Sequence, residues 1–158
     1  QSDIAKKVSI PIANGERMHS IWEFRELLSN GGPQYVRPDV GLAGGITQTK
    51  KIAAIAESYH SALVSHNFLG PILTADSVHI DTSIPNFITQ EYSLDDESKK
   101  NDYLISSLKR EGGYIITPEN PGLGIEIDKE KIKQVPYEPL NLNDQVPYRF
   151  DGSNAFSV

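Results

Sequence analysis

The stretch YVRPDVGLAGGIT, at residues 35–47, decides the fold of this chain. It predicts a short strand ending near Asp39, a glycine-rich loop and the start of a helix. A second strand is predicted at 62–65, with His66 directly after it. Strand, loop, helix and strand in this order form the unit from which parallel sheets are built. Because parallel strands end at the same edge of a sheet, we expect Asp39 and His66 to meet there, where α/β enzymes place their chemistry.

The same unit recurs along the first part of the chain. Apolar runs predict strands near residues 8–13, 35–40, 62–65 and 87–89, with helical segments between them. Two helix N-caps are expected: Ser20, which has Glu23 at capping-box spacing, and Thr47. We therefore expect an α/β fold with parallel strands, in which residues 1–95 form the βα units and residues 96–158 form a C-terminal loop, short strands and a tail.

The pattern changes after residue 95. A charged surface loop is expected at 95–102, followed by strand-like runs at 114–116 and 125–127 that a loop rich in Pro and Gly connects. The tail from Pro139 is polar and rich in turn residues, so we expect it to be weakly structured.

Composition limits the classes of function. The chain has 158 residues, of which 38% are hydrophobic and 23% charged, as expected for one folded domain. Its net charge of −6 argues against a nucleic acid or an anionic membrane as partner, and no apolar run approaches the roughly 20 residues of a membrane span. The absence of cysteine fits a reducing compartment, and we expect a cytoplasmic location. Because the chain begins with Gln1 and not Met, we expect a fragment or a processed chain.

Four ionisable residues follow the predicted strands: Glu16, Asp39, His66 and Glu91. Successive members are 23, 27 and 25 residues apart, which is near the roughly 30 residues per unit of a (β/α)₈ barrel. The spacing predicts that they line one mouth of a barrel-like sheet, where an Asp that orients a His makes a positioned general base. The alternative is that they are ordinary polar strand ends: a solvated His66, a turn residue at Asp39 and a surface charge at Glu91.

Five segments carry a resemblance to a known family. The chain resembles the C-terminal part of the enolase superfamily, in its mandelate racemase branch, and within that branch the sugar-acid dehydratases of the galactonate type. The segments are IPIANGER at 10–17, RPDVGLAGGIT at 37–47, SHN at 65–67, PNFITQE at 85–91 and PGLGI at 121–125. The resemblance implies the C-terminal part of a (β/α)₈-type, TIM-like barrel.

The resemblance also implies roles for the four residues. Glu16 would be one carboxylate ligand of a Mg²⁺ ion, Asp39 would orient His66 as the base, and Glu91 would hydrogen-bond the substrate carboxylate as it becomes an enediolate. The implied reaction converts a sugar acid such as D-galactonate into a 2-keto-3-deoxy acid. One carboxylate cannot hold Mg²⁺ tightly, so we expect the other ligands and the capping domain to come from a missing N-terminal portion or a companion chain. We also expect a homo-oligomer.

Other functions stay open at this point. A racemase or cycloisomerase of the same superfamily would use the same half-site, and a truncated barrel fragment without catalytic activity would carry the same motifs. The remaining histidines, His19, His60 and His79, are more simply explained as structural residues.

Overall fold

The computed structural model describes residues 2–97, 99–134, 139 and 148–153. The chain divides into two compact units, Gln1–Asp128 and Lys129–Val158, which are described separately. The first unit alternates strands and helices before it ends in short helical turns and hairpin strands. In chain order its elements are α1 (Ser2–Ala5), β1 (Ala13–Asn14), α2 (Ile21–Ser29), β2 (Tyr35–Val36), α3 (Ile46–Ser58), β3 (Ala62–Ser65), α4 (Pro71–Asp81), β4 (Phe87–Gln90), the 3₁₀ turns η1 (Asp95–Glu97) and η2 (Lys99–Tyr103), β5 (Leu104–Ser106), β6 (Arg110–Glu111), β7 (Tyr114–Ile115) and β8 (Glu126–Ile127).

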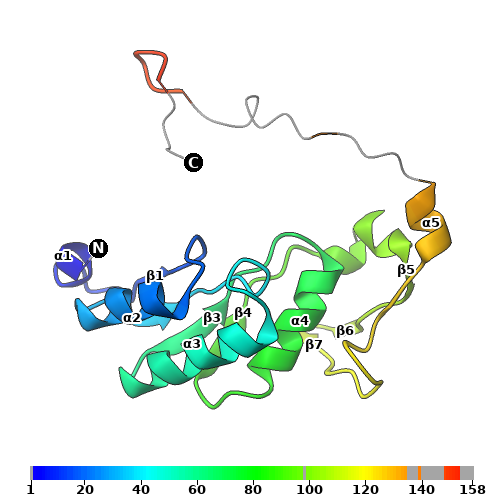
Figure 1. Cartoon of the computed structure of the whole chain (residues 1–158), viewed down its shortest axis with the longest axis horizontal. Coiled ribbons are helices and arrows are strands. Elements are labelled where there is room, and N and C mark those ends of the chain that lie inside the picture. Colours follow the sequence, from blue (N-terminus) through cyan, green and yellow to red (C-terminus); the bar gives the residue numbers. More distant parts are fainter. Residues whose placement is uncertain (1, 98, 135–138, 140–147, 154–158) are drawn as a thin grey trace. The chain divides into compact units, whose positions relative to one another are not determined.

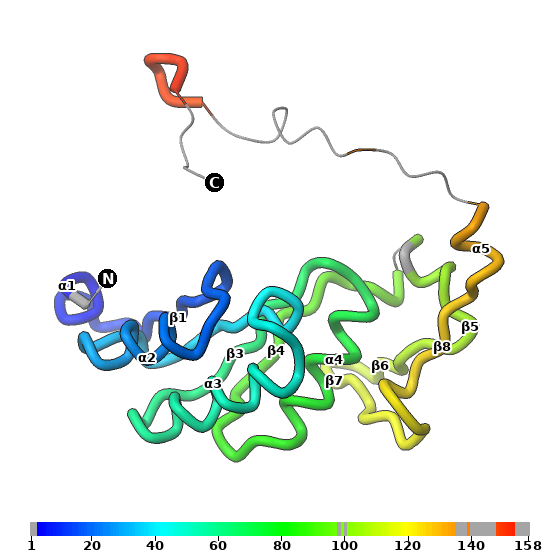
Figure 2. Tube along the Cα trace, in the orientation of Figure 1, coloured from blue at the N-terminus to red at the C-terminus, as the bar shows by residue number. Residues whose placement is uncertain are grey.

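Strands β1 to β4 form one sheet in the order β1-β2-β3-β4, and every pair is parallel. Ala13 pairs with Tyr35, Tyr35 with Ala62, and Leu63 with Phe87. Each connection runs through a helix, as parallel pairing requires, and Figure 2 follows this alternation along the chain. The predicted α/β fold with parallel strands is confirmed, and it brings the carboxyl ends of the four strands to one edge.

Helices α2, α3 and α4 form a layer beside the sheet, with α2 packed against α3 and α3 against α4 (Figure 1). The core lies between this layer and the sheet, and each fully buried aliphatic or aromatic side chain contributes about 1.5–3 kcal/mol. Its buried members are Phe24, Leu28, Val36, Val40, Ala43, Ile52, Ala53, Ala56, Leu63, Leu73 and Ile80. Within the described residues, no helix combines the length and apolarity that crossing a membrane requires.

The N-terminus of α2 has the predicted capping arrangement. Ser20 is extended, and its Oγ accepts a hydrogen bond from the backbone N–H of Glu23 at 3.4 Å. The Glu23 carboxylate returns to accept from Ser20 Oγ at 2.7 Å and from the backbone N–H of His19 at 3.0 Å. These hydrogen bonds lower the pKa of Glu23, and the reciprocal contacts explain why α2 begins at Ile21.

The prediction for α3 was wrong by two residues. The N-cap is Gly45, at φ 87° and ψ −176°, so Thr47 lies inside the helix and no side chain caps it. This backbone conformation is one that only glycine adopts without strain. The glycine-rich loop therefore determines where the helix begins, through backbone freedom and not through a hydroxyl group.

Strand β1 comprises only Ala13 and Asn14, so it is much shorter than the strand predicted near residues 8–13. Pro11 has no N–H to give to a neighbouring strand. The N–H of Ile12 binds the side chain of Gln34 at 2.9 Å, and parallel pairing starts where the N–H of Tyr35 donates to the carbonyl of Ile12 at 3.1 Å.

The last strands of the first unit pair in a way that the sequence pattern did not predict. β5 pairs antiparallel with β8, and β6 pairs antiparallel with β7. The predicted runs at 114–116 and 125–127 therefore belong to two different small sheets. The structure divides into its two compact units after Asp128, whereas the sequence pattern changes after residue 95.

The second unit contains α5 (Lys129–Lys133), whose Lys133 Nζ lies 2.7 Å from Glu130 Oε1, and a turn in which the N–H of Arg149 donates to the carbonyl of Ser153 at 2.7 Å. Most of the tail that was predicted to be weakly structured, from Pro139 onward, lies outside the described residues.

Candidate active site

Asp39 and His66 lie opposite each other beyond the ends of β2 and β3. Their backbones form an isolated parallel bridge, and the N–H of His66 donates to the carbonyl of Pro38 at 3.1 Å. His66 Nδ1 lies 3.0 Å from Asp39 Oδ2, with Asp39 fully buried and His66 9% exposed. Since an ionised carboxylate can only accept, Nδ1 is the donor in this contact and Nε2 is left with a free lone pair. This is the tautomer that a general base needs.

The other oxygen of Asp39 is held by the glycine-rich loop. Oδ1 accepts from the N–H of Leu42 at 3.0 Å, and the carbonyl of Asp39 accepts from the N–H of Ala43 at 2.8 Å. A Cβ at Gly41 would lie 3.2 Å from Oδ1, so a glycine there leaves the carboxylate its space. Asp39 is therefore fixed on both oxygens, which fixes the orientation of the imidazole.

Glu91 follows β4 and lies beside the free nitrogen of His66. Its N–H donates to the carbonyl of Ser65 at 3.0 Å, which extends the pairing of β3 with β4. Its Oε2 lies 3.7 Å from His66 Nε2, accepts from the N–H of Asn67 at 3.1 Å and accepts from Arg37 Nη2 at 2.7 Å. The side chains of Arg37 and Glu91 are 25% and 41% exposed, so the pair lies at the open rim of the site.

A buried polar network supports the backbone between His66 and α4. The Asn67 side chain is fully buried, and its Nδ2 donates to Thr74 Oγ1 at 2.6 Å. The Thr74 hydroxyl donates to the carboxylate of Asp95, which is also buried. The network anchors the peptide whose N–H binds Glu91 to the first turn of α4.

The Phe68 ring meets the imidazole of His66 edge to face, with ring centroids 5.1 Å apart and planes at 66°. This contact packs one side of the imidazole with apolar surface while Nε2 stays toward Glu91. The site thus combines an imidazole in a fixed tautomer, His66, with the carboxylate of Glu91 and the guanidinium of Arg37. Such an arrangement can remove a proton from a carbon atom that lies next to an anionic group.

Glu16 follows β1 in a turn and is partly exposed. Among the described residues, no hydrogen bond or ion pair joins Glu16 to Asp39, His66 or Glu91. The described part of the chain also contains no group of three or more His, Cys, Asp or Glu side chains that could hold a metal ion. These side chains therefore do not fit a complete Mg²⁺ centre, although Glu16 can offer one oxygen ligand of the hard type that Mg²⁺ prefers.

The structure thus brings together three of the four predicted residues and adds one that sequence reasoning missed. Arg37 was not predicted as a site residue, although a signal was present. Alternate residues of an extended segment point to the same face of a sheet. Arg37 and Asp39 are two residues apart, so a prediction that places Asp39 at this edge also places Arg37 there.

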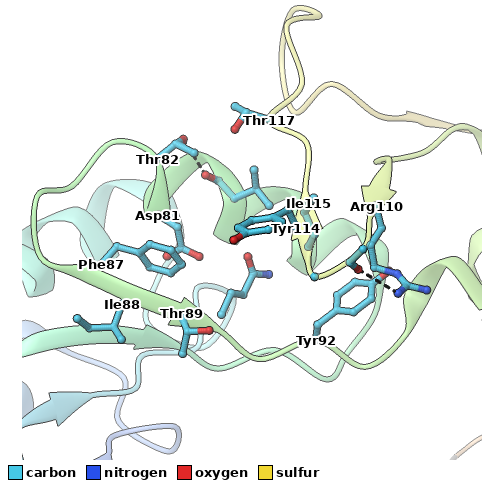
Figure 3. Close-up of a pocket in the computed structure, with 14 residues that line it drawn as sticks. Asp81, Thr82, Phe87, Ile88, Thr89, Tyr92, Arg110, Tyr114, Ile115 and Thr117 are labelled. Atoms are coloured by element: carbon cyan, nitrogen blue, oxygen red, sulfur yellow. Dashed lines mark hydrogen bonds between the residues drawn. The ribbon is translucent and has the colours of Figure 1, made fainter.

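A separate hollow of about 440 Å³ lies beside α4, β4 and the β6–β7 hairpin. Figure 3 shows Asp81, Phe87 and Tyr114 among the side chains that line it, and none of the four predicted site residues is among them. Asp81 is 6% exposed and accepts from Ser65 Oγ at 2.5 Å. Burial raises its pKa to about 7, against the opposing effect of the Ser65 hydrogen bond. Ser65 and His66 are neighbours in the chain, so their side chains point to opposite faces of the sheet. Asp81, which contacts Ser65, therefore lies on the face that the helices cover.

The comparison with protein families gives a match over most of the chain. The model of the family described as enolase C-terminal domain-like matches residues 1–131. A D-galactonate dehydratase of Variovorax paradoxus (strain S110) is 37% identical over 158 residues, which cover 96% of this chain and 41% of that protein. A D-galactonate dehydratase of Cronobacter sakazakii (strain ATCC BAA-894) is 42% identical over 135 residues, which cover 82% of this chain and 35% of that protein. The chain thus spans about two fifths of the length of these curated relatives.

Solved structures show the same fold. A mandelate racemase/muconate lactonizing enzyme from Jannaschia sp. CCS1 superposes with a TM-score of 0.81 at 33% identity, covering 89% of this chain and 36% of that one. An enolase from Agrobacterium radiobacter, solved with Na and L-malate bound, superposes with a TM-score of 0.84 at 28% identity, covering 99% of this chain and 42% of that one.

Proposed function

Because the chain belongs to the enolase C-terminal domain-like family, we propose that it carries the proton-abstracting half of a sugar-acid dehydratase. The proposed substrate is an aldonate such as D-galactonate, and the product is a 2-keto-3-deoxy acid. One observation carries the proposal: His66 Nδ1 lies 3.0 Å from a buried Asp39 while Nε2 lies 3.7 Å from Glu91 Oε2, in a chain 37–42% identical to D-galactonate dehydratases.

The first proposed step is removal of the C2 proton by His66 Nε2. The C2–H bond breaks, the proton moves to Nε2, and the electron pair enters the enediolate of the substrate carboxylate. Asp39 holds the imidazole in the required tautomer and stabilises the imidazolium that forms. Such a proton is weakly acidic, and each 1.36 kcal/mol by which the site lowers the energy of the intermediate gives about tenfold in rate.

The second step expels the C3 hydroxyl group. The C3–O bond breaks as the electron pair of the enediolate forms a double bond between C2 and C3, and the leaving hydroxide takes a proton to become water. The resulting enol then takes a proton at C3 and loses the proton of its C2 hydroxyl group as the C2=O bond forms, which gives the 2-keto-3-deoxy acid. In this scheme Glu91 hydrogen-bonds the substrate carboxylate as it becomes an enediolate, and its position 3.7 Å from His66 Nε2 supports that role.

We also propose Mg²⁺ as the cofactor, with Glu16 as one ligand. When bound, the ion would stabilise negative charge on the substrate carboxylate. The described side chains supply no complete centre, so the remaining ligands would come from the portion of the relatives that this chain does not span, or from a companion chain. That portion would also provide the acid that protonates the leaving hydroxide, and the assembled enzyme is proposed to be a homo-oligomer.

A racemase or cycloisomerase is the second candidate, because solved neighbours carry the name mandelate racemase/muconate lactonizing enzyme. Both candidates share abstraction of the C2 proton, and they differ in whether water is lost. That an enolase neighbour was solved with L-malate, a 2-hydroxy acid, supports the substrate class that they share.

The test uses the full chain, alone and co-expressed with the N-terminal portion of the Variovorax paradoxus relative. Each preparation is given D-galactonate and Mg²⁺ in D₂O. NMR follows deuterium at C2, and a keto-acid assay follows the product. The dehydratase proposal expects keto acid that carries deuterium at C3 from the combined preparation, with or without deuterium at C2 of the remaining galactonate, and neither signal from its His66→Asn variant. Deuterium at C2 without keto acid would favour the racemase, and neither exchange nor keto acid in any combination would favour an inert fragment.

A further inference from the structure

The buried network of Asn67, Thr74 and Asp95 joins the two segments of the chain that carry His66 and Glu91. Asn67 directly follows His66, and Asp95 comes four residues after Glu91. Between them, in the first turns of α4, Thr74 Oγ1 accepts from Asn67 Nδ2 at 2.6 Å, and the Thr74 hydroxyl donates to the carboxylate of Asp95. All three side chains are buried. The loop after β3 and the loop after β4 are thus tied to the same part of one helix.

The charge of Asp95 decides where the Thr74 hydroxyl points. A hydroxyl group has one hydrogen to donate, and Thr74 Oγ1 has two acceptors in reach, the carbonyl of Gly70 at 3.2 Å and the carboxylate of Asp95. The carboxylate is the stronger acceptor, because hydrogen bonds to ionised groups are about twice as strong as those between neutral groups. The lone pairs of Oγ1 are then left for Asn67 Nδ2, which fixes the orientation of that amide.

The contacts form a closed ring that includes Glu91. The backbone N–H of Asn67 donates to Glu91 Oε2 at 3.1 Å, and the chain itself leads from Glu91 to Asp95. The same carboxylate oxygen lies 3.7 Å from His66 Nε2. Because the ring fixes the peptide of Asn67 relative to the segment that carries Glu91, it also fixes the Glu91 carboxylate beside the proposed base.

A second pair of buried side chains shows what a contact for folding alone looks like. The Ser65 hydroxyl donates to the carboxylate of Asp81 at 2.5 Å, on the face of the sheet that the helices cover. Among the described contacts, these two side chains bind each other and none of Asp39, His66 and Glu91. The network of Asn67, by contrast, ends in a hydrogen bond to a proposed site residue.

We propose that Thr74 and Asp95 are positioning residues, which act through Asn67 to hold Glu91 in place for the reaction. This inference rests on the proposed function, in which Glu91 hydrogen-bonds the substrate carboxylate as it becomes an enediolate. Such a contact is stronger in the transition state than in the bound substrate, so weakening it lowers kcat and leaves KM nearly unchanged. A misplacement of about 1 Å, caused by a change away from the reacting atoms, can cost about 100-fold in rate.

The experiment measures kcat and KM with D-galactonate in the combined preparation described above, for keto-acid formation or, if no keto acid forms, for C2 exchange. Thr74→Val removes both contacts of the hydroxyl, and we expect kcat to fall by about 10- to 100-fold while KM changes by less than about threefold. Thr74→Ser keeps the hydroxyl and should retain kcat within about threefold of the wild type. Ser65→Ala is the matched control, because it takes a hydroxyl from the other buried aspartate, Asp81, and it should also stay within about threefold.

The outcomes separate this inference from the proposed function. With an active wild type, the positioning role is refuted if Thr74→Val keeps its kcat, if its KM rises as much as its kcat falls, or if Ser65→Ala loses as much; the proposed function then stands. A wild type that neither forms keto acid nor exchanges the C2 proton overturns the proposed function, and this inference with it.

Circular dichroism checks that each variant folds. If Thr74→Val does not fold, Asp95→Asn takes its place, because a neutral amide has no charge to direct the Thr74 hydroxyl. We expect its kcat to fall by more than about fivefold at a nearly constant KM, and an unchanged kcat would refute the role of Asp95.

Discussion

The carboxylate of Asp39 touches the His66 ring at 3.0 Å while the loop N–H of Leu42 holds its other oxygen at 3.0 Å. The side chain that orients the imidazole is thus itself oriented by the backbone. The contact with His66 is buried and the contact with Leu42 is partly buried, so these hydrogen bonds have few competing partners from solvent. The orientation of the His66 imidazole is therefore set by a chain of contacts that begins in the glycine-rich loop.

Asp39→Asn should abolish most of the proton abstraction without unfolding the protein. The amide oxygen can still accept from Leu42, but the amide nitrogen would then donate to Nδ1 of His66 and move the ring proton to Nε2. We expect C2 deuterium exchange to fall by on the order of 10²–10⁴-fold. Asp81→Asn is a matched control, a buried aspartate on the other face of the sheet, and it should retain exchange. Equal loss in both variants would contradict a specific role for Asp39.

The contribution of Asp81 to the stability of the fold should decrease between about pH 4 and pH 7. Its pKa is raised from 3.8 to about 7, chiefly by burial, so the folded state binds the proton more tightly than the unfolded state. The stabilisation from this proton is complete below the unfolded pKa and is lost as pH rises through the folded pKa, with a size of up to about 4 kcal/mol. Urea denaturation of the wild type and Asp81→Asn at several pH values measures it. A difference between the two that does not change with pH would refute the assignment.

Thr74→Val should destabilise the fold by about 1–3 kcal/mol, because the valine has nearly the same shape but no hydroxyl. The change removes the partner of Asn67 Nδ2 and one donor to the buried carboxylate of Asp95. Thr74→Ser keeps the hydroxyl and serves as the control, with a smaller expected cost. Chemical denaturation of the two variants is the measurement, and equal costs would show that the hydroxyl network contributes nothing.

Gly15→Ala should cost more stability than Gly45→Ala. Both glycines have positive φ, at 131° and 87°, so both variants pay for backbone strain. At Gly15 the new Cβ would also lie 2.6 Å from the ring of Phe24, which is fully buried, whereas at Gly45 nothing lies within 4 Å. We expect a difference of about 1–3 kcal/mol, as for other overpacked cores, visible as a lower melting temperature. Equal melting temperatures would mean that the Phe24 ring moves aside freely.

The features that sequence predicted well are those set by local pattern or by family motifs. The capping pair of Ser20 and Glu23 was found as predicted, because its hydrogen bonds join residues three apart. The order of parallel strands followed from the repeated unit, and the resemblance to the enolase superfamily is confirmed by the family match over residues 1–131. The contact of Asp39 with His66 also lies where parallel strand ends should bring it, while the catalytic roles stay predictions.

The features that sequence missed depend on backbone conformation or on distant partners. The cap of α3 is Gly45 and not Thr47, because a conformation that only glycine tolerates takes precedence over a hydroxyl group. β7 pairs with β6 and β8 pairs with β5, and the alternation of apolar and polar residues alone does not determine which strands pair. Arg37 was missed because its place beside Glu91, 54 residues along the chain, depends on how β2, β3 and β4 are set side by side.

The hydrogen bond from the N–H of Leu42 to the carboxylate of Asp39 has a consequence for protein engineering. Mutant libraries that aim at a new substrate usually vary the residues that face the ligand and assume that changes in connecting loops do not affect the site. Here, lengthening or reshaping the segment from Gly41 to Gly45 would rotate the carboxylate that orients the imidazole and so, under the proposed function, alter turnover for every substrate at once. Rational redesign should therefore keep this segment intact and place its diversity elsewhere on the rim.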